Sequence, residues 1–290
     1  MTNSLVKRLD SNLKKITNRV LGFDIDDKLK RIPTPVNDFG FDPFGFKPES
    51  LRYAALPAYL IYKYYFRVEV FGLENVPDRN MMFIANHAGQ LPFDGFLVAA
   101  ALLLEKDPPR LVRSMVEKWA PTLPFVNTFF ARTGQIVGTP ENAIKLLNMK
   151  ESILVFPEGV KGINKTFNKR YQLQEFGTGF MKIAMATRTP IIPVAVIGSE
   201  EQQISFANLK NIGAIFGMPA FPITLTFPWI FPIGILPYPV KYRIHFGRPI
   251  YFEERHDNDE DVLERNVAEV KSTLQSLIYK GLKERKSIFW

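Results

Sequence analysis

The sequence predicts an α/β fold in which helices flank a central, mostly parallel or mixed sheet, with amphipathic helices ahead of it at the N-terminus. Short β-rich runs alternate with helical patterns from residue 67 onwards, an order that is typical of α/β layers. A chain of 290 residues is long enough to bury a sizeable core. Its 46% hydrophobic and 23% charged residues lie close to the globular average, which excludes disordered and fibrous classes.

The first fifty residues contain a basic helical pattern and an irregular lead-in. An apolar stripe at helical spacing, with Lys and Arg around the rest of the helix, is formed by Leu5, Leu9, Leu13, Ile16 and Val20. Such a helix either lies on an anionic membrane or packs against its own domain. Pro and Gly in residues 31–50 predict a linker or an ordered wrap. We therefore divide the chain into this lead-in, 1–50, and a single domain, 51–290.

The elements of that domain follow from local patterns. Residues 50–66 predict a helix rich in Tyr and Leu. Strands are predicted at 67–71, 81–85, 111–115, 152–156, 191–197 and 241–246, and helices at 94–104, 140–149, 175–187 and 258–282. Thr139-Pro140 is a typical helix start, because Pro at the first helical position loses only a donor that has no partner there. Acidic residues begin the last helix and Lys ends it, as the helix dipole prefers.

The charge balance indicates an anionic partner. Thirty-seven Lys and Arg against twenty-nine Asp and Glu leave a net charge of +8, which suits nucleic acid, an anionic membrane or an anionic substrate. The basic residues form no recognisable nucleic-acid motif, so we expect no nucleic-acid partner. The absence of Cys excludes a disulfide scaffold, a thiol nucleophile and a thiolate metal site. No His and carboxylate cluster has ligand spacing, so no metal is expected.

One segment departs from the pattern of a soluble domain. Residues 211–240 carry no charge and contain six prolines, which exclude a continuous helix. We interpret this segment as a loop-rich apolar wall that lines a pocket or dips into a bilayer interface, with a surface excursion packed on the core as the alternative. Met1–Arg31 has no apolar run of signal-peptide length, and no stretch has the ~20 apolar residues of a spanning helix. The expectation is peripheral or interfacial membrane association on the cytoplasmic side.

His87 is the first candidate for chemistry. It follows the apolar run Met82–Ala85 directly and precedes a helix for which Asp94 is the predicted N-cap. Ligands in α/β sheets bind at this position, after the carboxyl end of a strand. On a continuous helix His87 and Asp94 would lie about 10 Å apart, so the loop must fold back if they are to touch. A touching carboxylate fixes the tautomer and leaves the other ring nitrogen as a base, whereas an Asp94 that does not touch is only a cap. His245 and His256 are interpreted as structural or solvated.

A second polar cluster follows the predicted strand 152–156. Glu158 and Gly159 come directly after Phe156-Pro157, and four cations follow at Lys161, Lys165, Lys169 and Arg170. A carboxylate beside Gly-supported backbone amides, together with nearby cations, can receive a hydroxyl or a phosphate. A charged surface turn is the alternative.

Three blocks carry a family resemblance by their combination and order. They are Asn86-His87 with Asp94, Phe156-Pro157-Glu158-Gly159, and Pro190-Ile191-Ile192-Pro193-Val194. Together they resemble the first, third and fourth motifs of the PlsC-like glycerolipid and lysophospholipid acyltransferases. Residues 227–250 are similar to the diacylglycerol and monoacylglycerol acyltransferase-like branch of that family. The resemblance covers about residues 66–252.

The resemblance implies acyl transfer from an acyl thioester, acyl-CoA or acyl carrier protein, to a glycerolipid or lysophospholipid hydroxyl. His87 would act as general base and Asp94 would orient it. The implied substrate-binding residues are Asn86, Glu158, Gly159, Lys161 and Arg170, with the two cations near the donor's phosphates. No cofactor beyond the acyl-CoA or acyl-ACP co-substrate is implied, and a membrane surface joins the donor and acceptor as partners. A thioester or lipid hydrolase and a non-catalytic peripheral membrane protein are the alternatives.

Two departures from the family pattern affect the expected contact between His87 and Asp94 and the expected acceptor lipid. Six residues separate His87 from Asp94 where the family has four, so contact between them requires a two-residue bulge. Pro140 stands where the second motif is expected to supply a phosphate-binding Arg, and Lys161 replaces an Arg of the third. These replacements favour a neutral glyceride or another lipid alcohol over lysophosphatidic acid.

Overall fold

A central seven-stranded sheet organises the molecule in the computed structural model, which describes residues 2–32, 34–89, 91–118, 122, 126–215, 221–252 and 260–290. The strand order is β1-β9-β6-β2-β5-β3-β4, and only the β6–β9 pair is antiparallel. The strands are β1 Glu69–Phe71, β2 Met82–Ala85, β3 Val112–Val116, β4 Ile136–Val137, β5 Ser152–Val155, β6 Ile191–Ile197 and β9 Arg243–Phe246. The predicted α/β class with a mixed sheet is confirmed, and β4 is the one strand of this sheet that was not predicted.

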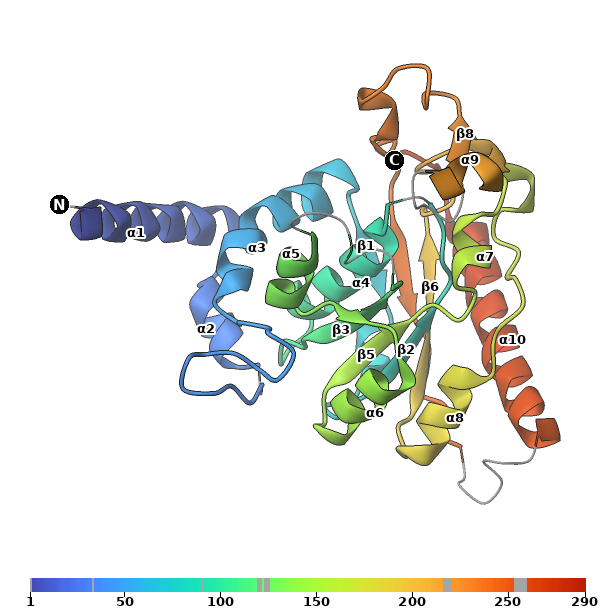
Figure 1. Cartoon of the computed structure of the whole chain (residues 1–290), viewed down its shortest axis with the longest axis horizontal. Helices are drawn as coiled ribbons and strands as arrows, with labels where there is room; N and C mark the ends of the chain where they lie inside the picture. The colour runs from blue at the N-terminus through green and yellow to red at the C-terminus, as the bar shows by residue number, and fades with distance from the viewer. Residues whose placement is uncertain are drawn as a thin grey trace.

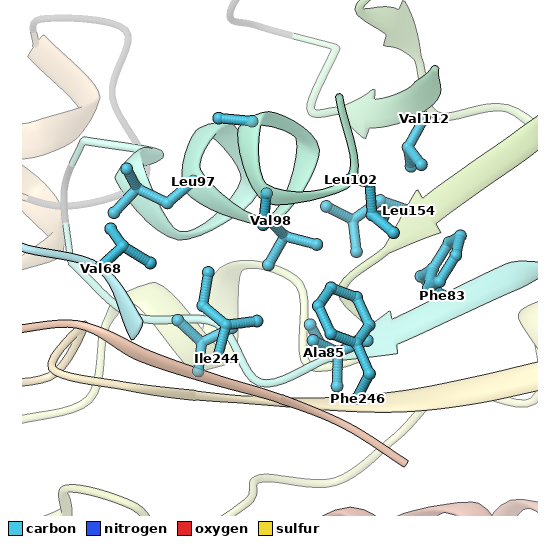
Figure 2. Close-up of a cluster of buried hydrophobic side chains, with 14 of the residues drawn as sticks. Val68, Phe83, Ala85, Leu97, Val98, Leu102, Val112, Leu154, Ile244 and Phe246 are labelled. Atoms are coloured by element: carbon cyan, nitrogen blue, oxygen red, sulfur yellow. The ribbon is translucent and has the colours of Figure 1, made fainter. Parts of the chain in front are cut away.

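The middle strands are apolar throughout because helices cover both faces of the sheet. On one face lies α4, Phe93–Leu104, whose Leu97, Val98 and Leu102 pack against Phe83 and Ala85 of β2 (Figure 2). The other face is covered by α6 Pro140–Asn148, α8 Gly179–Ala186 and α10 Glu260–Glu284 (Figure 1). Successive residues of β2 therefore belong to opposite cores, as the pleat of a strand requires.

The predicted helices are present with adjusted ends. The helix predicted at 50–66 is α3 Ser50–Leu60 followed by a π-helical turn at Ile61–Tyr65. Thr139 caps α6 by accepting the N–H of Asn142, with Pro140 as the first helical residue. Of the acidic start predicted for the last helix, Glu260 and Asp261 lie in the first turn of α10, whereas residues 253–259, which include His256, lie outside the described residues. Elements that were not predicted are α2 Ile25–Lys30, α5 Val126–Thr133, α7 Val160–Ile163, α9 Lys210–Ile215, β7 Ser205–Leu209 and β8 Phe221–Thr224.

The N-terminal lead-in is an ordered wrap that begins with a projecting helix. The helix α1, Thr2–Leu21, extends away from the body of the molecule (Figure 1). Leu13, Ile16 and Val20 of its predicted apolar stripe are exposed, so this part of the stripe is not buried in the domain. Among the described residues, no helix combines the length and apolar character needed to cross a bilayer.

A buried ion cluster holds the later part of this wrap on the sheet. Arg113 of β3 is completely buried, and its Nη1 lies 2.7 Å from both Asp42 Oδ2 and Glu151 Oε2. Its Nε donates to the carbonyl oxygen of Gly134 at 2.8 Å. Because Asp42 belongs to the wrap and Glu151 directly precedes β5, one guanidinium joins three distant parts of the chain.

Candidate active site

The site forms at the carboxyl end of β2, where the chain leaves the sheet. Asn86 is fully buried here, and its side-chain amide exchanges two hydrogen bonds with the backbone of Val196, at 2.9 and 2.8 Å. Both polar groups of Asn86 are therefore used to join the end of β2 to β6. Its structural role is shown by these bonds, and a role in substrate binding stays a prediction.

His87 and Asp94 touch, as the catalytic interpretation requires. His87 Nδ1 lies 2.6 Å from Asp94 Oδ2, and Oδ2 also accepts the N–H of Ala88 at 3.0 Å. Asp94 Oδ1 accepts the N–H of Gly95 at 2.7 Å. The N-cap of α4 is Pro92, so the prediction of Asp94 as N-cap is wrong. Asp94 lies instead in the first turn, where its buried carboxylate folds the preceding loop back onto itself.

A left-handed glycine and a buried amide shape that loop. Gly89 has φ +83°, and a Cβ there would lie 2.1 Å from Gln202 Nε2. Gln202 is buried, its Nε2 donates to the carbonyl oxygens of Ala88 and Leu91 at 3.4 Å, and its Oε1 accepts the hydroxyl of Tyr242 at 2.8 Å. The two additional residues between His87 and Asp94 are thus accommodated by a loop that β6 and its following turn hold in place.

The imidazole of His87 is mostly buried but remains accessible. Its side chain is 13% exposed, and the ring stacks on Phe156 with centroids 4.3 Å apart. Burial lowers the pKa of His87, but the charge and hydrogen bond of Asp94 more than offset this and raise the pKa above its ordinary value. Because Nδ1 donates to the carboxylate, Nε2 is the nitrogen that can accept a proton.

Glu158 binds the backbone next to the imidazole. Its Oε1 accepts the N–H of His87 at 3.0 Å, and its Oε2 accepts the N–H of Gln174 at 2.8 Å. Gly162, one turn later, packs so closely that a Cβ would lie 3.0 Å from the carbonyl oxygen of His87. The Glu158 segment and the His87 loop are therefore in direct contact, because they follow the neighbouring strands β5 and β2.

Lys165 is the cation that the structure brings to Glu158. Its Nζ lies 3.2 Å from Glu158 Oε2 and 2.7 Å from Glu200 Oε1, and its side chain is 3% exposed. Burial raises the pKa of Glu200 to about 7, against the opposing charge of Lys165. The Lys165 cluster, Glu158–Lys165–Glu200, therefore has no excess positive charge at neutral pH.

The two cations expected to bind substrate lie elsewhere. Lys161 pairs with Glu175 at 3.0 Å, and both side chains are exposed. The Arg170 guanidinium lies over the ring of Phe167, 4.4 Å from its centroid. Gly159 begins α7 with φ +51°, a conformation that favours glycine. A role for Lys161 and Arg170 towards the donor's phosphates stays a prediction.

A small pocket of about 20 Å³ lies beside the His87 loop and the Lys165 cluster. It is lined by Ala88, Gly89, Gly162, Ile163, Lys165, Thr166, Phe167, Glu200, Gln203 and Ser205. Glu200, Gln202, Gln203 and Ser205 were not predicted as site residues. Their signal was the polar run after the buried strand 191–197, the same pattern that identified His87. Among the described residues, no three His, Asp or Glu side chains are grouped so as to hold a metal ion.

The uncharged segment 211–240 does not line this pocket. Within its described part, residues 225–236 expose most of their large side chains, including Trp229 and Phe231, whereas Phe227 is buried. Residues 216–220 lie outside the described residues. The pocket-lining interpretation therefore fails for 225–236, and the surface interpretations remain.

Comparison with known proteins identifies the family. Residues 67–197 match the family model described as Acyltransferase. An uncharacterised protein of Mycobacterium tuberculosis is 36% identical over the whole chain, which spans 80% of that protein. A chicken (Gallus gallus) protein named "DGAT1/2-independent enzyme synthesizing storage lipids" is 24% identical over 74% of this chain and 60% of its own length. The crystal structure of the 1-acyl-sn-glycerophosphate acyltransferase PlsC from Thermotoga maritima aligns with a TM-score of 0.47 and 18% identity, covering 82% and 84% of the two chains.

The chain belongs to this acyltransferase family, which confirms the PlsC-like resemblance of its three sequence blocks. It is therefore an acyltransferase. The matched range includes His87, Asp94 and Glu158 and ends with the last residue of β6.

Proposed function

We propose that the protein transfers a fatty acyl group from an acyl thioester to a glycerolipid hydroxyl, with His87 as the general base and Asp94 as its partner. The observation that carries this proposal is the 2.6 Å contact between His87 Nδ1 and the buried carboxylate of Asp94. That contact fixes the tautomer and leaves Nε2 free to take a proton at the carboxyl end of β2. The names of the chicken relative and the bacterial structure support a glycerolipid substrate.

The reaction proceeds by direct transfer. Nε2 of His87 takes the hydroxyl proton as the hydroxyl oxygen attacks the thioester carbonyl. The new carbon–oxygen bond forms, the carbon–sulfur bond breaks, and the proton passes from the imidazolium to the leaving thiolate. The carboxylate of Asp94 stabilises the imidazolium between these two steps. The sequence contains no Cys, and no Gly-x-Ser-x-Gly elbow, to form an acyl-enzyme, which favours one transfer over two.

The Lys165 cluster favours an uncharged acceptor. A phosphate headgroup would need a cation that is not already neutralised by other anions, because burying an unpaired anion is costly. Lys165 is the only cation among the residues that line the pocket, and two carboxylates already neutralise it. Carboxylates and hydroxyls in the same pocket can instead hold the hydroxyl groups of a glyceride. We propose a mono- or diacylglycerol as acceptor and either acyl-CoA or acyl-ACP as donor.

A product assay tests the acceptor. Purified protein is incubated with labelled acyl-CoA or acyl-ACP and, in separate reactions, with lysophosphatidic acid, other lysophospholipids, monoacylglycerol and diacylglycerol. We expect labelled glyceride as the main product. Label appearing on lysophosphatidic acid alone would overturn the neutral acceptor, and label released as free fatty acid without any acceptor would identify a hydrolase.

A further inference from the structure

We propose that residues 225–236, the apolar tip, insert into the surface of a lipid bilayer and hold the pocket beside His87 against it. The value of this insertion for catalysis rests on the proposed function, because a glyceride acceptor is found in a bilayer. In Figure 1 this segment, drawn in orange, rises beyond the end of the sheet at the top of the molecule.

The tip exposes large apolar side chains that a folded domain normally buries. Trp229 and Phe231 are each 69% exposed and Ile233 is 67% exposed. Leu225, Ile230 and Leu236 are exposed as well. No charged residue occurs between residues 211 and 240. Single exposed apolar residues are common on protein surfaces, whereas a group of large apolar side chains without charges marks an interaction site.

The tip is a folded unit whose backbone groups are largely satisfied within it. Thr224 Oγ1 accepts the N–H of Phe227 at 2.8 Å, and the indole N–H of Trp229 donates to the carbonyl oxygen of Thr224 at 3.1 Å. The N–H groups of Ile230 and Gly234 donate to Thr226 and Ile230 at 2.9 and 2.7 Å. Two prolines, at 228 and 232, bring no N–H at all. Entry into an apolar medium requires this internal pairing, because lipid tails offer no hydrogen-bond partners.

The tip lies next to the pocket. Ser205, which lines the pocket, pairs across the β7–β8 hairpin with Thr224, directly before the tip begins. Gln203, another pocket residue, donates through Nε2 to the carbonyl oxygen of Ile235 at 2.8 Å. Insertion of the tip therefore places the pocket mouth close to the lipid headgroups.

The surroundings of the tip fit a bilayer interface. The hydroxyl of Tyr65 donates to the carbonyl oxygen of Pro237, and the neighbouring Tyr64 and Lys63 are exposed. Tyr and Trp are the residues that collect at the level of lipid headgroups, and a Lys beside them can meet lipid phosphates. The tip is a projection and not a groove, so it suits a soft, deformable lipid surface.

Vesicle sedimentation tests the proposal. Full-length protein is mixed with phosphatidylcholine vesicles, which carry no net charge, and the bound fraction is measured at low and high salt. We expect the parent to bind with little salt dependence, because the tip is uncharged. Trp229→Ser and Phe231→Ser should each weaken binding about tenfold, the loss expected when one buried aromatic side chain no longer enters lipid.

Two further variants make the test specific. Phe39→Ser removes an equally exposed aromatic residue in the N-terminal wrap and should leave binding unchanged. A triple variant, Leu13→Ser with Ile16→Ser and Val20→Ser, removes the exposed stripe of α1. Tip variants that bind like the parent, or binding that only the α1 variant loses, would overturn the proposal.

An activity arm separates this proposal from the proposed function. Sedimentation is measured without any acyl transfer, so it stands whether or not the protein acylates a glyceride. If transfer is observed, the tip variants should lose rate on a vesicle-borne acceptor and keep the parent rate on a short-chain, water-soluble acceptor. An equal loss on both acceptors would indicate that the tip serves the pocket itself and not the membrane.

Discussion

The buried carboxylate of Asp94 sets both the position and the basicity of His87. One of its oxygens holds the imidazole and the N–H of Ala88, so the loop cannot move without breaking both contacts. Its charge also raises the pKa of His87 against the effect of burial. A general base must be neutral to act, so the raised pKa predicts that activity falls on the acid side from a pH above the ordinary titration of histidine.

Asp94→Asn tests this electrostatic role. The variant removes the negative charge, so the pKa of His87 should fall and the acid limb of the kcat/KM profile should move to lower pH. The rate on the plateau should also fall, because an amide can stabilise the wrong tautomer. The measurement is kcat/KM as a function of pH for parent and variant. An acid limb at the same pH in the parent and the variant would show that the group titrating in this profile is not His87.

The close packing around Gly162 leads to a second prediction. A Cβ there would lie 2.9 Å from the Cβ of Glu158 and 3.0 Å from the carbonyl oxygen of His87. Gly162→Ala should therefore displace the His87 loop, at a cost of about 1–3 kcal/mol, and reduce acyl transfer. Gly177→Ala is the matched control, because nothing lies within 4 Å of its added Cβ. Equal activities for these two variants would contradict the packing argument.

The strands were predictable where both faces are buried, and less so elsewhere. β2, β5 and β6 are short apolar runs followed by polar residues, and such runs identify strands of parallel sheets. The hairpin β7–β8 escaped prediction because Pro222 lies inside β8 and no alternating pattern continues through it. The helix α8 begins at Gly179 and not at the predicted residue 175, since the N–H of Gly177 donates to the carbonyl oxygen of Pro157 before the helix starts.

The residues of the site differ in the same way in how far the sequence could predict them. His87, Asp94 and Glu158 follow strand ends and could be predicted from the sequence. The contacts of Lys165 with Glu200 and of Gln202 with the His87 loop could not, because distant turns that only the fold brings together contribute the partners. Lys161 was favoured over Lys165 by the motif, yet one turn of α7 directs it to Glu175 on the surface.

Arg113 joins the N-terminal wrap to β3 and β5, and we expect this contact to stabilise all three against unfolding. Arg113→Ala leaves the carboxylates of Asp42 and Glu151 buried without a cation, which should lower the free energy of unfolding by about 3–5 kcal/mol. Lys30→Ala is the control, since its pair with Asp27 is exposed and such pairs contribute about 0–1 kcal/mol. Urea denaturation measures both. Similar midpoints for the two variants would contradict the joining role.

Across the whole molecule, the pocket beside the His87 loop contacts the apolar tip through Gln203, while α1 projects from the body elsewhere (Figure 1). The net charge of +8 supplies a general attraction to anionic surfaces, whereas the tip supplies an uncharged contact next to the pocket. The fold therefore places a proposed base, a proposed acceptor pocket and a proposed lipid contact side by side.

The projecting α1 leads to a prediction about stability. Leu13, Ile16 and Val20 are 36%, 55% and 37% exposed and none belongs to a buried core cluster, so replacing all three with Ser should remove little packing from the domain. We expect the free energy of unfolding to change by less than about 0.5 kcal/mol per substitution. Urea denaturation in the absence of lipid provides the measurement. A large loss of stability would place this stripe against the domain.

The central claim is that His87 is the base of an acyl transfer, and its most direct test is the turnover of purified His87→Ala. Labelled acyl-CoA or acyl-ACP and glyceride are supplied to parent and variant, and an unchanged circular dichroism spectrum and urea midpoint establish that the variant is folded. The account predicts a loss of about 10²–10⁴-fold in the rate of labelled glyceride formation. A folded variant that works at the parent rate would contradict it.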